Sequence, residues 1–226
     1  MSIRNQTGRS NAIDHALGEF QSGYELVQNH FESLNDDQRQ KTAHWATAAA
    51  WHQRDFQAMA DYVNFHPRGT SKSSYKAILD INTGNYSSAC AHIAKAQTIS
   101  YDELQTHLGI GPQLSIKSLA KTEVLAELEE VIQYKTQGDS REQILRFWSQ
   151  RFRRSHANAN TWLKRLQVWM LACPPTTVEL QSCFLDCAKL CESSGMHATA
   201  KRLINLVMPK VNPPVSKRDD EKKYHS

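Results

Sequence analysis

Residues 125–135, Leu-Ala-Glu-Leu-Glu-Glu-Val-Ile-Gln-Tyr-Lys, decide the fold class of this chain. The apolar residues of the stretch recur at the three- and four-residue spacing of one helix face: Leu125, Leu128, Val131 and Ile132. The charged residues fall mostly on the opposite face: Glu127, Glu129, Glu130 and Lys135. This pattern predicts an amphipathic helix with its apolar face buried and most of its charges in solvent.

Similar apolar stripes recur along most of the chain. They predict helices over residues 41–52, 57–65, 73–83, 85–99, 113–121, 124–134, 141–154, 160–172, 178–192 and 197–207, after a helix pair in residues 12–34 that carries Tyr24, Leu26, Val27 and Phe31 inward. No stretch alternates apolar and polar residues strictly, which is the pattern of a half-buried strand. The chain is therefore predicted to be all α, with about ten to twelve helices.

The helices also repeat as pairs. Six turn positions of a tetratricopeptide-like unit align at 18, 54, 84, 123, 159 and 195, and the small or apolar residues expected at fixed offsets are best formed after 84 and 195. His66 and Lys164 interrupt them after 54 and 159. The spacing of the turns lies near the roughly 34 residues expected of such hairpins. A single hairpin cannot bury its apolar stripe, so hairpins stack into a superhelical array. Residues 12–209 are predicted to form a degenerate α-solenoid of this kind.

The ends and the composition limit the class of protein. Residues 1–11 are too polar for the apolar core of a secretory signal, and no later run approaches the roughly 20 apolar residues that span a bilayer. Five cysteines at irregular spacing are typical of reduced thiols, so a cytoplasmic location is expected. The net charge of +4 does not indicate a nucleic-acid partner. Residues 210–226 are charged and contain prolines, and are predicted to be disordered.

Two groups of residues offer candidate chemistry. Cys183, Cys187 and Cys191 lie four apart on one side of a predicted helix and could contribute to a metal site with His197. Structural zinc sites favour closely spaced ligand pairs across a turn, so packing of buried thiols is the preferred interpretation. The ten histidines are scattered, without a His-Glu-x-x-His pair or an adjacent nucleophile motif, and are expected at the surface or as satisfied interior residues.

No motif for catalysis is present. Gly109 and Gly111 are followed by Pro112 and by no phosphate-binding Lys-Ser/Thr pair, and neither His-Arg-Asp nor Asp-Phe-Gly occurs. The sequence therefore predicts a chain that is not an enzyme, with no catalytic, cofactor-binding or metal residue assigned. Five tryptophans are interpreted as spacers between hairpins: Trp45, Trp51, Trp148, Trp162 and Trp169. Residues 141–165 are locally basic: Arg141, Arg146, Arg151, Arg153, Arg154, Lys164 and Arg165. A solvated face is the preferred interpretation, and a site for an anionic ligand or an acidic partner is the alternative.

Residues 127–135, Glu-Leu-Glu-Glu-Val-Ile-Gln-Tyr-Lys, resemble a segment of the FAT domain of the target of rapamycin (TOR) kinases, in the phosphatidylinositol-3-kinase-related kinase family. The similarity spans about residues 8–209, and its specificity comes from that length. Other matching segments are 17–20, 48–51, 75–77, 91–96, 141–142, Trp148, Arg151, 162–164, 190–191 and 194–195. After Pro209 the sequence departs from the pattern. The chain is therefore interpreted as a fragment, a truncated gene product or a piece of a larger protein.

The resemblance implies a solenoid of tetratricopeptide-like and HEAT-like hairpins that wraps a kinase domain as a C-shaped clamp. It implies serine/threonine kinase activity in a separate domain, and partners among that kinase domain and the TOR complex subunits. Some members hold inositol hexakisphosphate in a basic pocket, and Lys135, Arg141, Arg151 and Lys164 match basic positions of the resemblance. Two alternatives stay open: a free-standing tetratricopeptide-like adaptor that binds peptides, and a small enzyme whose site lacks a local motif.

Overall fold

The computed structural model describes residues 20–108, 112–155 and 158–208, and every regular element in these ranges is helical. The all-α prediction is confirmed for this part of the chain. The α helices are α2 (Phe20–His30), α3 (Asp36–Gln53), α4 (Phe56–Val63), α5 (Thr70–Thr83), α6 (Tyr86–Leu108), α7 (Pro112–Thr136), α8 (Arg141–Arg154), α9 (Ala159–Trp169), α10 (Val178–Ser193) and α11 (His197–Val207). Two short 3-10 helices, η3 (Phe31–Ser33) and η4 (Gly138–Ser140), lie between them.

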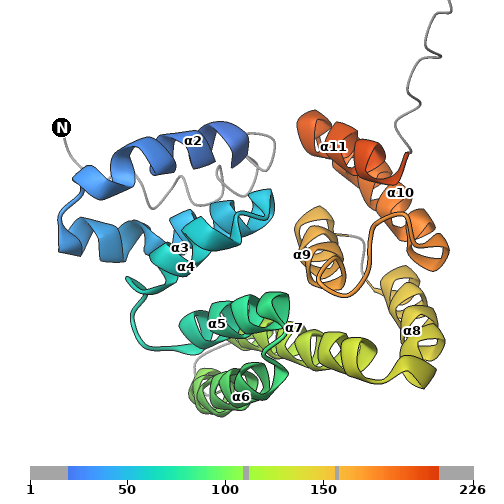
Figure 1. Cartoon of the computed structure of the whole chain (residues 1–226), viewed down its shortest axis with the longest axis horizontal. Coiled ribbons are helices and arrows are strands. Elements are labelled where there is room, and N and C mark those ends of the chain that lie inside the picture. Colours follow the sequence, from blue (N-terminus) through green and yellow to red (C-terminus); the bar gives the residue numbers. More distant parts are fainter. Residues whose placement is uncertain (1–19, 109–111, 156–157, 209–226) are drawn as a thin grey trace, which may run out of the picture.

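Consecutive helices pack against each other as the hairpins of a curved solenoid (Figure 1). The closest pairs are α3 with α4, α5 with α6, α6 with α7, and α10 with α11. The array bends so that α9 also contacts α7, and α8 contacts α10. The curvature brings α9 and α11 back beside the end of α3, where Arg202 Nη2 donates to the His52 carbonyl and Gln167 hydrogen-bonds His52.

Local signals explain where several helices begin and end. Asn35 caps α3 in a reciprocal capping box with Gln38. Asp55 caps α4 by accepting from the Ala58 amide at 2.9 Å. Helices α3 and α5 each end in a left-handed residue, Arg54 at φ 59° and Gly84 at φ 79°. These two positions, with the left-handed Gly195 after α10, match three of the six predicted repeat turns.

The α5–α6 hairpin is the predicted repeat unit in its most regular form. Its inward positions carry small or branched apolar residues that are almost completely buried: Ala77, Ile78, Ala89, Ile93 and Ala96. Small residues let the two helix axes approach closely, which increases the area in van der Waals contact. The core continues without a break from α3 through α11.

Two predictions about these helices are wrong. Helix α7 runs uninterrupted from Pro112 to Thr136, so the repeat register at 123 marks no turn. The segment contains no glycine or proline after Pro112, so nothing in it opposes helix propagation. Leu26 was expected inward but is 62% exposed among the described residues. The inward face of α2 follows Tyr24, Val27 and Phe31, and Leu26 lies about 100° away from Val27 around the helix.

Residues 1–19 and 209–226 lie outside the described ranges. The first helix of the predicted pair in residues 12–34 and the predicted disordered tail, residues 210–226, therefore both stay predictions. The most N-terminal predicted repeat turn, at position 18, is also in this part of the chain.

Candidate functional site

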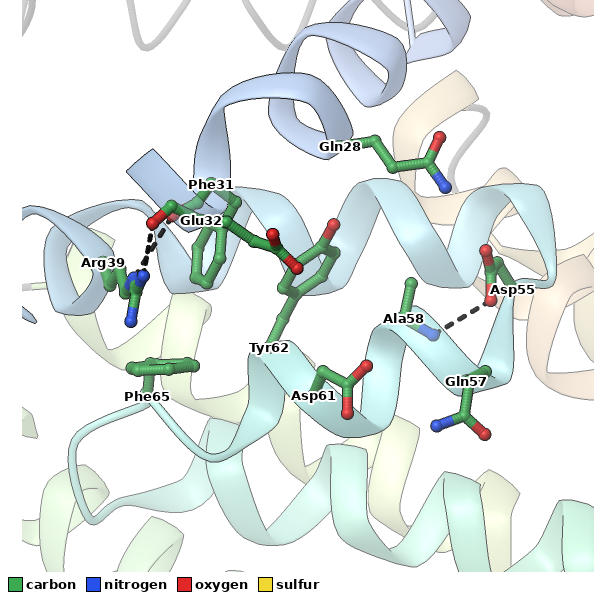
Figure 2. Close-up of a pocket in the computed structure, with 10 residues that line it drawn as sticks. All are labelled: Gln28, Phe31, Glu32, Arg39, Asp55, Gln57, Ala58, Asp61, Tyr62 and Phe65. Atoms are coloured by element: carbon green, nitrogen blue, oxygen red, sulfur yellow. Dashed lines mark hydrogen bonds between the residues drawn. The ribbon is translucent and has the colours of Figure 1, made fainter. Parts of the chain in front are cut away.

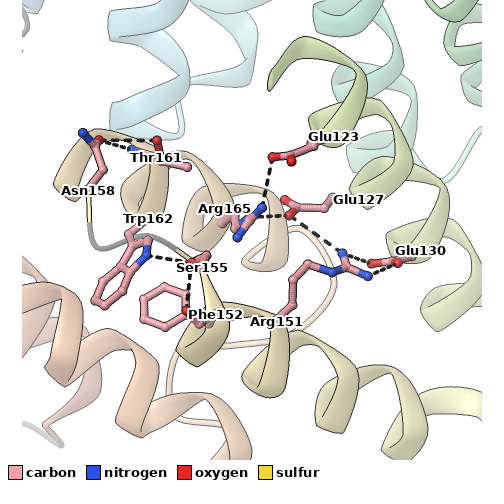
Figure 3. Close-up of polar contacts among 10 residues, drawn as sticks. All are labelled: Glu123, Glu127, Glu130, Arg151, Phe152, Ser155, Asn158, Thr161, Trp162 and Arg165. Atoms are coloured by element: carbon pink, nitrogen blue, oxygen red, sulfur yellow. Dashed lines mark hydrogen bonds and ion pairs between the residues drawn. The ribbon is translucent and has the colours of Figure 1, made fainter. Parts of the chain in front are cut away.

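The densest polar feature of the interior is a charged cluster where α7 meets α8 and α9 (Figure 3). We define the charged cluster as Glu123, Glu127, Glu130, Arg151 and Arg165. The three glutamates come from α7 at helical spacing, Arg151 comes from α8, and Arg165 comes from α9. The cluster therefore joins three helices by charge as well as by apolar contact.

Each arginine of the charged cluster contacts two glutamates. Arg165 Nε lies 2.7 Å from Glu127 Oε1, and Arg165 Nη2 donates to Glu123 Oε2 at 3.1 Å. Arg151 makes a two-pronged contact with Glu130, at 3.0 Å and 2.6 Å, and its Nη1 lies 3.9 Å from Glu127 Oε1. Planar two-pronged pairs of this kind fix orientation as well as charge.

Glu127 is the most buried member of the charged cluster, with 1% of its side chain exposed, and the Arg165 side chain is 8% exposed. The Arg165 contact is an ion pair without the alignment of a hydrogen bond, and neither Glu127 oxygen has a hydrogen-bond donor among the described residues. Burial raises the pKa of Glu127 to about 7, against the opposing effects of Arg165 and Arg151. The ion pairs with Arg165 and Arg151 therefore do not fully offset the desolvation cost of burying the Glu127 carboxylate.

The buried position of Glu127 corrects the sequence prediction, which placed it mostly among the solvent-facing charges. Glu127 borders the apolar stripe beside Val131, and a second neighbour, α9, covers this flank of α7. Periodicity assigns one buried face to a helix, whereas α7 packs on several helices at once. The sequence signal for this buried pair is weak: a glutamate at the edge of an apolar stripe and an arginine on a later helix.

An aromatic stack extends the charged cluster. Trp148 is completely buried, lies parallel to Trp169 with ring centroids 5.3 Å apart, and stacks on Tyr134 at 5.9 Å. Its Nε1 donates to Glu130 Oε2 at 2.6 Å. Trp162 packs against Phe152 at 4.1 Å. The prediction of tryptophan spacers between hairpins is confirmed for the contact of Trp148 with Tyr134 of α7, whereas Trp169 and Trp162 pack between α8 and α9 of one predicted repeat.

The remaining two tryptophans lie on α3. Trp51 is half-buried and packs edge-on against Tyr75, which is also consistent with a spacer. Trp45 is 39% exposed and has His44 beside it. Trp45 therefore does not fill space between hairpins in the way that Trp148 does.

The cysteine group is part of the core. Cys183, Cys187 and Cys191 are at most 1% exposed along one side of α10, as packing of small thiols predicts. His197, considered with them as a metal ligand, is exposed and places Nδ1 2.9 Å from Glu192 Oε1. Among residues 20–108, 112–155 and 158–208, no group of three or more His, Cys, Asp or Glu side chains could hold a metal ion.

Two interior histidines make contacts that sequence reasoning did not assign. His66 is buried and hydrogen-bonds Thr47 Oγ1 at 2.9 Å and the Ala43 carbonyl at 3.0 Å, which ties the end of α4 to α3. His52 contacts Gln167 and Arg202, and burial, followed by the Arg202 charge, lowers its pKa to about 3. His52 is therefore neutral at physiological pH.

The basic residues between 141 and 165 do not form one free patch. Arg151 and Arg165 are engaged by glutamates of α7, and Arg146 pairs with Glu142 at 2.5 Å. Arg141 donates to the Tyr134 carbonyl at 3.0 Å and lies over its ring. Burial lowers the pKa of His44 and of His52 in α3, and the charge of Lys164 adds a smaller effect of the same sign.

The curved array of hairpins defines an α-solenoid whose polar interior is engaged in holding helices together. A family model, the FAT domain, matches residues 43–223, and the chain belongs to this family. Its curated relatives include the serine/threonine-protein kinase mTor of Drosophila melanogaster, 29% identical over 202 residues, and TOR2 of Saccharomyces cerevisiae, 26% identical over 204 residues. The TOR kinase of Arabidopsis thaliana is 25% identical over 235 residues. The expected resemblance to the FAT domain of TOR kinases is thereby confirmed.

The chain corresponds to a small part of these relatives. The alignments cover 88% of this chain with the fly and yeast proteins and 93% with the plant protein, but only 8–9% of each relative. The chain thus matches a helical region of a protein kinase. Within its described ranges, no helix is both long enough and apolar enough to cross a membrane.

Proposed function

We propose that this chain is a non-catalytic helical scaffold, a part of a TOR-type FAT domain that supports and restrains a kinase domain. The observation that carries the proposal is the continuous buried core of α3–α11, joined at α7, α8 and α9 by the charged cluster. A solenoid with its helices joined in this way should keep its curvature when a partner binds to one face. A scaffold that surrounds another domain requires such rigidity.

The buried charges support a scaffold role over a catalytic one. In the charged cluster every arginine is neutralised by glutamates of α7, so no unpaired cation is presented to a substrate. We infer that the serine/threonine kinase activity named for the relatives belongs to a separate domain of such proteins. The partners would be that kinase domain and subunits of a TOR complex, in the cytoplasm.

The test is co-purification of the 226-residue chain with a separately expressed TOR kinase domain, followed by size-exclusion chromatography with light scattering. A stable one-to-one complex is expected, and a kinase domain from another family serves as the control. A folded monomer that does not associate would contradict the clamp role and favour the free-standing adaptor. Phosphate transfer by the purified chain alone would contradict the non-catalytic assignment.

For inositol hexakisphosphate, the geometry predicts weak binding to this chain on its own. Arg151 is held by two oxygens of Glu130, so a polyphosphate at this position must displace a carboxylate. Lys135 and Arg141 are exposed. Titration calorimetry with inositol hexakisphosphate, comparing the natural chain with Glu130→Gln, tests this. Tight binding by the natural chain would show that the basic residues form a complete pocket.

A further inference from the structure

A second polar feature lies far from the charged cluster, in a pocket between α2, η3, α3 and α4 (Figure 2). Its volume is about 680 Å³. One wall is aromatic, made by Phe31, Tyr62 and Phe65, and carboxylates stand at the rim from Glu32, Asp55 and Asp61. We call this feature the acidic pocket. The function proposed above makes no use of it.

The aromatic wall is fixed in place by its own packing. Phe31 lies 4.6 Å from the ring of Tyr62 and 5.4 Å from the ring of Phe65. Phe31 and Tyr62 are 5% and 7% exposed, so each is held by the core and presents only part of its surface to the pocket. A wall of this kind is available to a ligand without rearrangement.

The carboxylates at the rim differ in their engagement. Asp55 accepts from the Ala58 amide as the cap of α4 and from the Tyr24 hydroxyl. Glu32 and Asp61 are exposed, and their carboxylates form no hydrogen bond or ion pair with any described residue. Two carboxylates are therefore free to receive a donor from outside.

Tyr62 reports the field inside the acidic pocket. The residue as a whole is 7% exposed, and its hydroxyl, which is not among the completely buried atoms without a partner, forms no hydrogen bond with any described residue. Burial raises the Tyr62 pKa, and Asp55, Asp61 and Glu32 raise it further, because all three negative charges disfavour a phenolate. Figure 2 shows the Glu32 carboxylate beside the Tyr62 ring. The hydroxyl is thus an unused polar group in a negative potential.

Among the described residues, Arg39 is the basic residue that lines the pocket, and its guanidinium points to one end of the pocket. Its guanidinium donates to the carbonyls of Phe31 and Glu32, at 3.2 Å and 2.5 Å, and lies 5.4 Å from the Phe65 ring centroid. Among the described residues of the lining, three carboxylates stand against one arginine, which gives this part of the lining a net negative charge. Arg39 also shows that an aromatic ring of this wall can support a guanidinium.

We propose that the acidic pocket binds a lysine or arginine side chain from a basic segment of a partner protein. The aliphatic stem would lie along the aromatic wall, and the charged head would reach Glu32, Asp61 and the Tyr62 hydroxyl. Charge complementarity selects this occupant. An anion would be repelled, and a purely apolar ligand would desolvate two carboxylates without replacing their hydrogen bonds. The proposal rests on the chemistry of the pocket and holds whether or not the chain associates with a kinase domain.

The test uses the full chain and a fluorescein-labelled peptide with three arginines separated by alanines. The matched peptide carries citrulline, which has the shape of arginine without its charge. Binding is measured by fluorescence anisotropy for the natural chain and for a double variant, Glu32→Gln with Asp61→Asn. The control variant, Glu129→Gln with Asp139→Asn, removes the same charge at exposed sites outside the pocket.

We expect the arginine peptide to bind the natural chain and the control variant with similar affinity. Binding to the pocket variant should be about tenfold weaker, since exposed ion pairs each contribute a factor of up to about five. Binding should also weaken as salt is added. Both variants alter exposed side chains, and circular dichroism should show unchanged melting.

Four outcomes would overturn the proposal. Equal loss of affinity in the pocket and control variants would show attraction by net charge alone. Equal binding of the citrulline peptide would show that no cation is recognised, and absence of binding would show that the pocket takes no basic segment. A chain without residues 1–19 that binds the peptide far more tightly would point instead to the chain's own N-terminal segment, which carries Arg4 and Arg9, as the occupant.

Discussion

The α5–α6 hairpin and the α7–α8–α9 group solve the same packing problem with different residues. The α5–α6 hairpin buries small and branched apolar side chains on both helices, and its turn is a left-handed glycine, Gly84. The α7–α8–α9 group buries two stacked tryptophans, a glutamate and an arginine. The hairpin also packs on α7, but the described buried side chains of its two helices include no charged residue, so no third helix has to pair one. The group is satisfied only when three helices are in place together.

This difference predicts where the solenoid is sensitive to substitution. Apolar contacts in the α5–α6 hairpin tolerate small losses, because no polar group is left unpaired. In the α7–α8–α9 group, loss of one member exposes another to an unfavourable environment. Four sets of measurements test this difference, in order of decreasing expected effect.

The largest effect is expected for Trp148→Ala, which removes a completely buried ring and leaves Glu130 without its indole donor. The free energy of unfolding should fall by about 3–5 kcal/mol. In the α5–α6 hairpin, Ile93→Val should cost about 1 kcal/mol. Urea denaturation followed by circular dichroism measures both. A loss below about 1 kcal/mol for Trp148→Ala would show that the aromatic stack does not hold the three helices together.

Arg165→Ala should cost about 3 kcal/mol at pH 8, because it leaves the Glu127 carboxylate buried without its nearest cation. At pH 6 the cost should be smaller, since Glu127 is then mostly protonated. Replacing both residues with methionine is the matched control and should restore most of the stability. A double variant as unstable as Arg165→Ala would contradict an electrostatic cause.

The pH dependence of the natural chain should reveal Glu127 directly. Its pKa is about 7 in the folded chain and 4.5 as a free side chain, so the folded state holds the proton more tightly. The contribution of Glu127 to stability is therefore greatest below about pH 4.5 and is lost as pH rises through 7, by about 1–3 kcal/mol. Comparing urea denaturation of Glu127→Gln and the natural chain from pH 5 to 8 isolates this term. Parallel curves would contradict the raised pKa.

The smallest effect is expected at the turns. Gly84→Ala should lower the free energy of unfolding by about 1 kcal/mol, because φ is 79° and a residue with a Cβ is strained there. The cost should not be larger, since an added Cβ meets no atom within 4 Å. At Arg54, φ is 59° with a side chain already present. Arg54→Gly should change stability by less than about 0.5 kcal/mol, because relief of backbone strain offsets the lost contacts with Met170 and Phe56. Thermal melts of both variants test this order.

Sequence periodicity predicted the turn and the buried face of the α5–α6 hairpin because their determinants are local, but α6 runs to Leu108, beyond the predicted end at residue 99. Gly84 stops one helix, and the spacing of Ala89, Ile93 and Ala96 defines the buried face of the next. The bounds of α8 and α11 were also predicted correctly, at Arg141–Arg154 and His197–Val207. In these cases the residues that decide the structure are neighbours in the chain.

The charged cluster and the acidic pocket could not be predicted in the same way. Glu127 and Arg165 are 38 positions apart, and nothing in either local pattern indicates the other. Tyr62 has the periodicity of a core residue, which it is, while the carboxylates around it come from η3 and from both ends of α4. Partners brought together by tertiary packing leave no periodic trace in the sequence.

The return of α11 to the end of α3 has a consequence for the order of folding. His52 and Arg202 are separated by 150 residues, and His52 and Gln167 by 115. Most solenoid contacts are between neighbours, so such an array can grow from any point along its length. Contacts of high sequence separation form late, because they require closure of a long loop. The contact between His52 and Arg202 can form only after α11 has left the ribosome. We therefore expect the array to close its curve after neighbouring hairpins have packed.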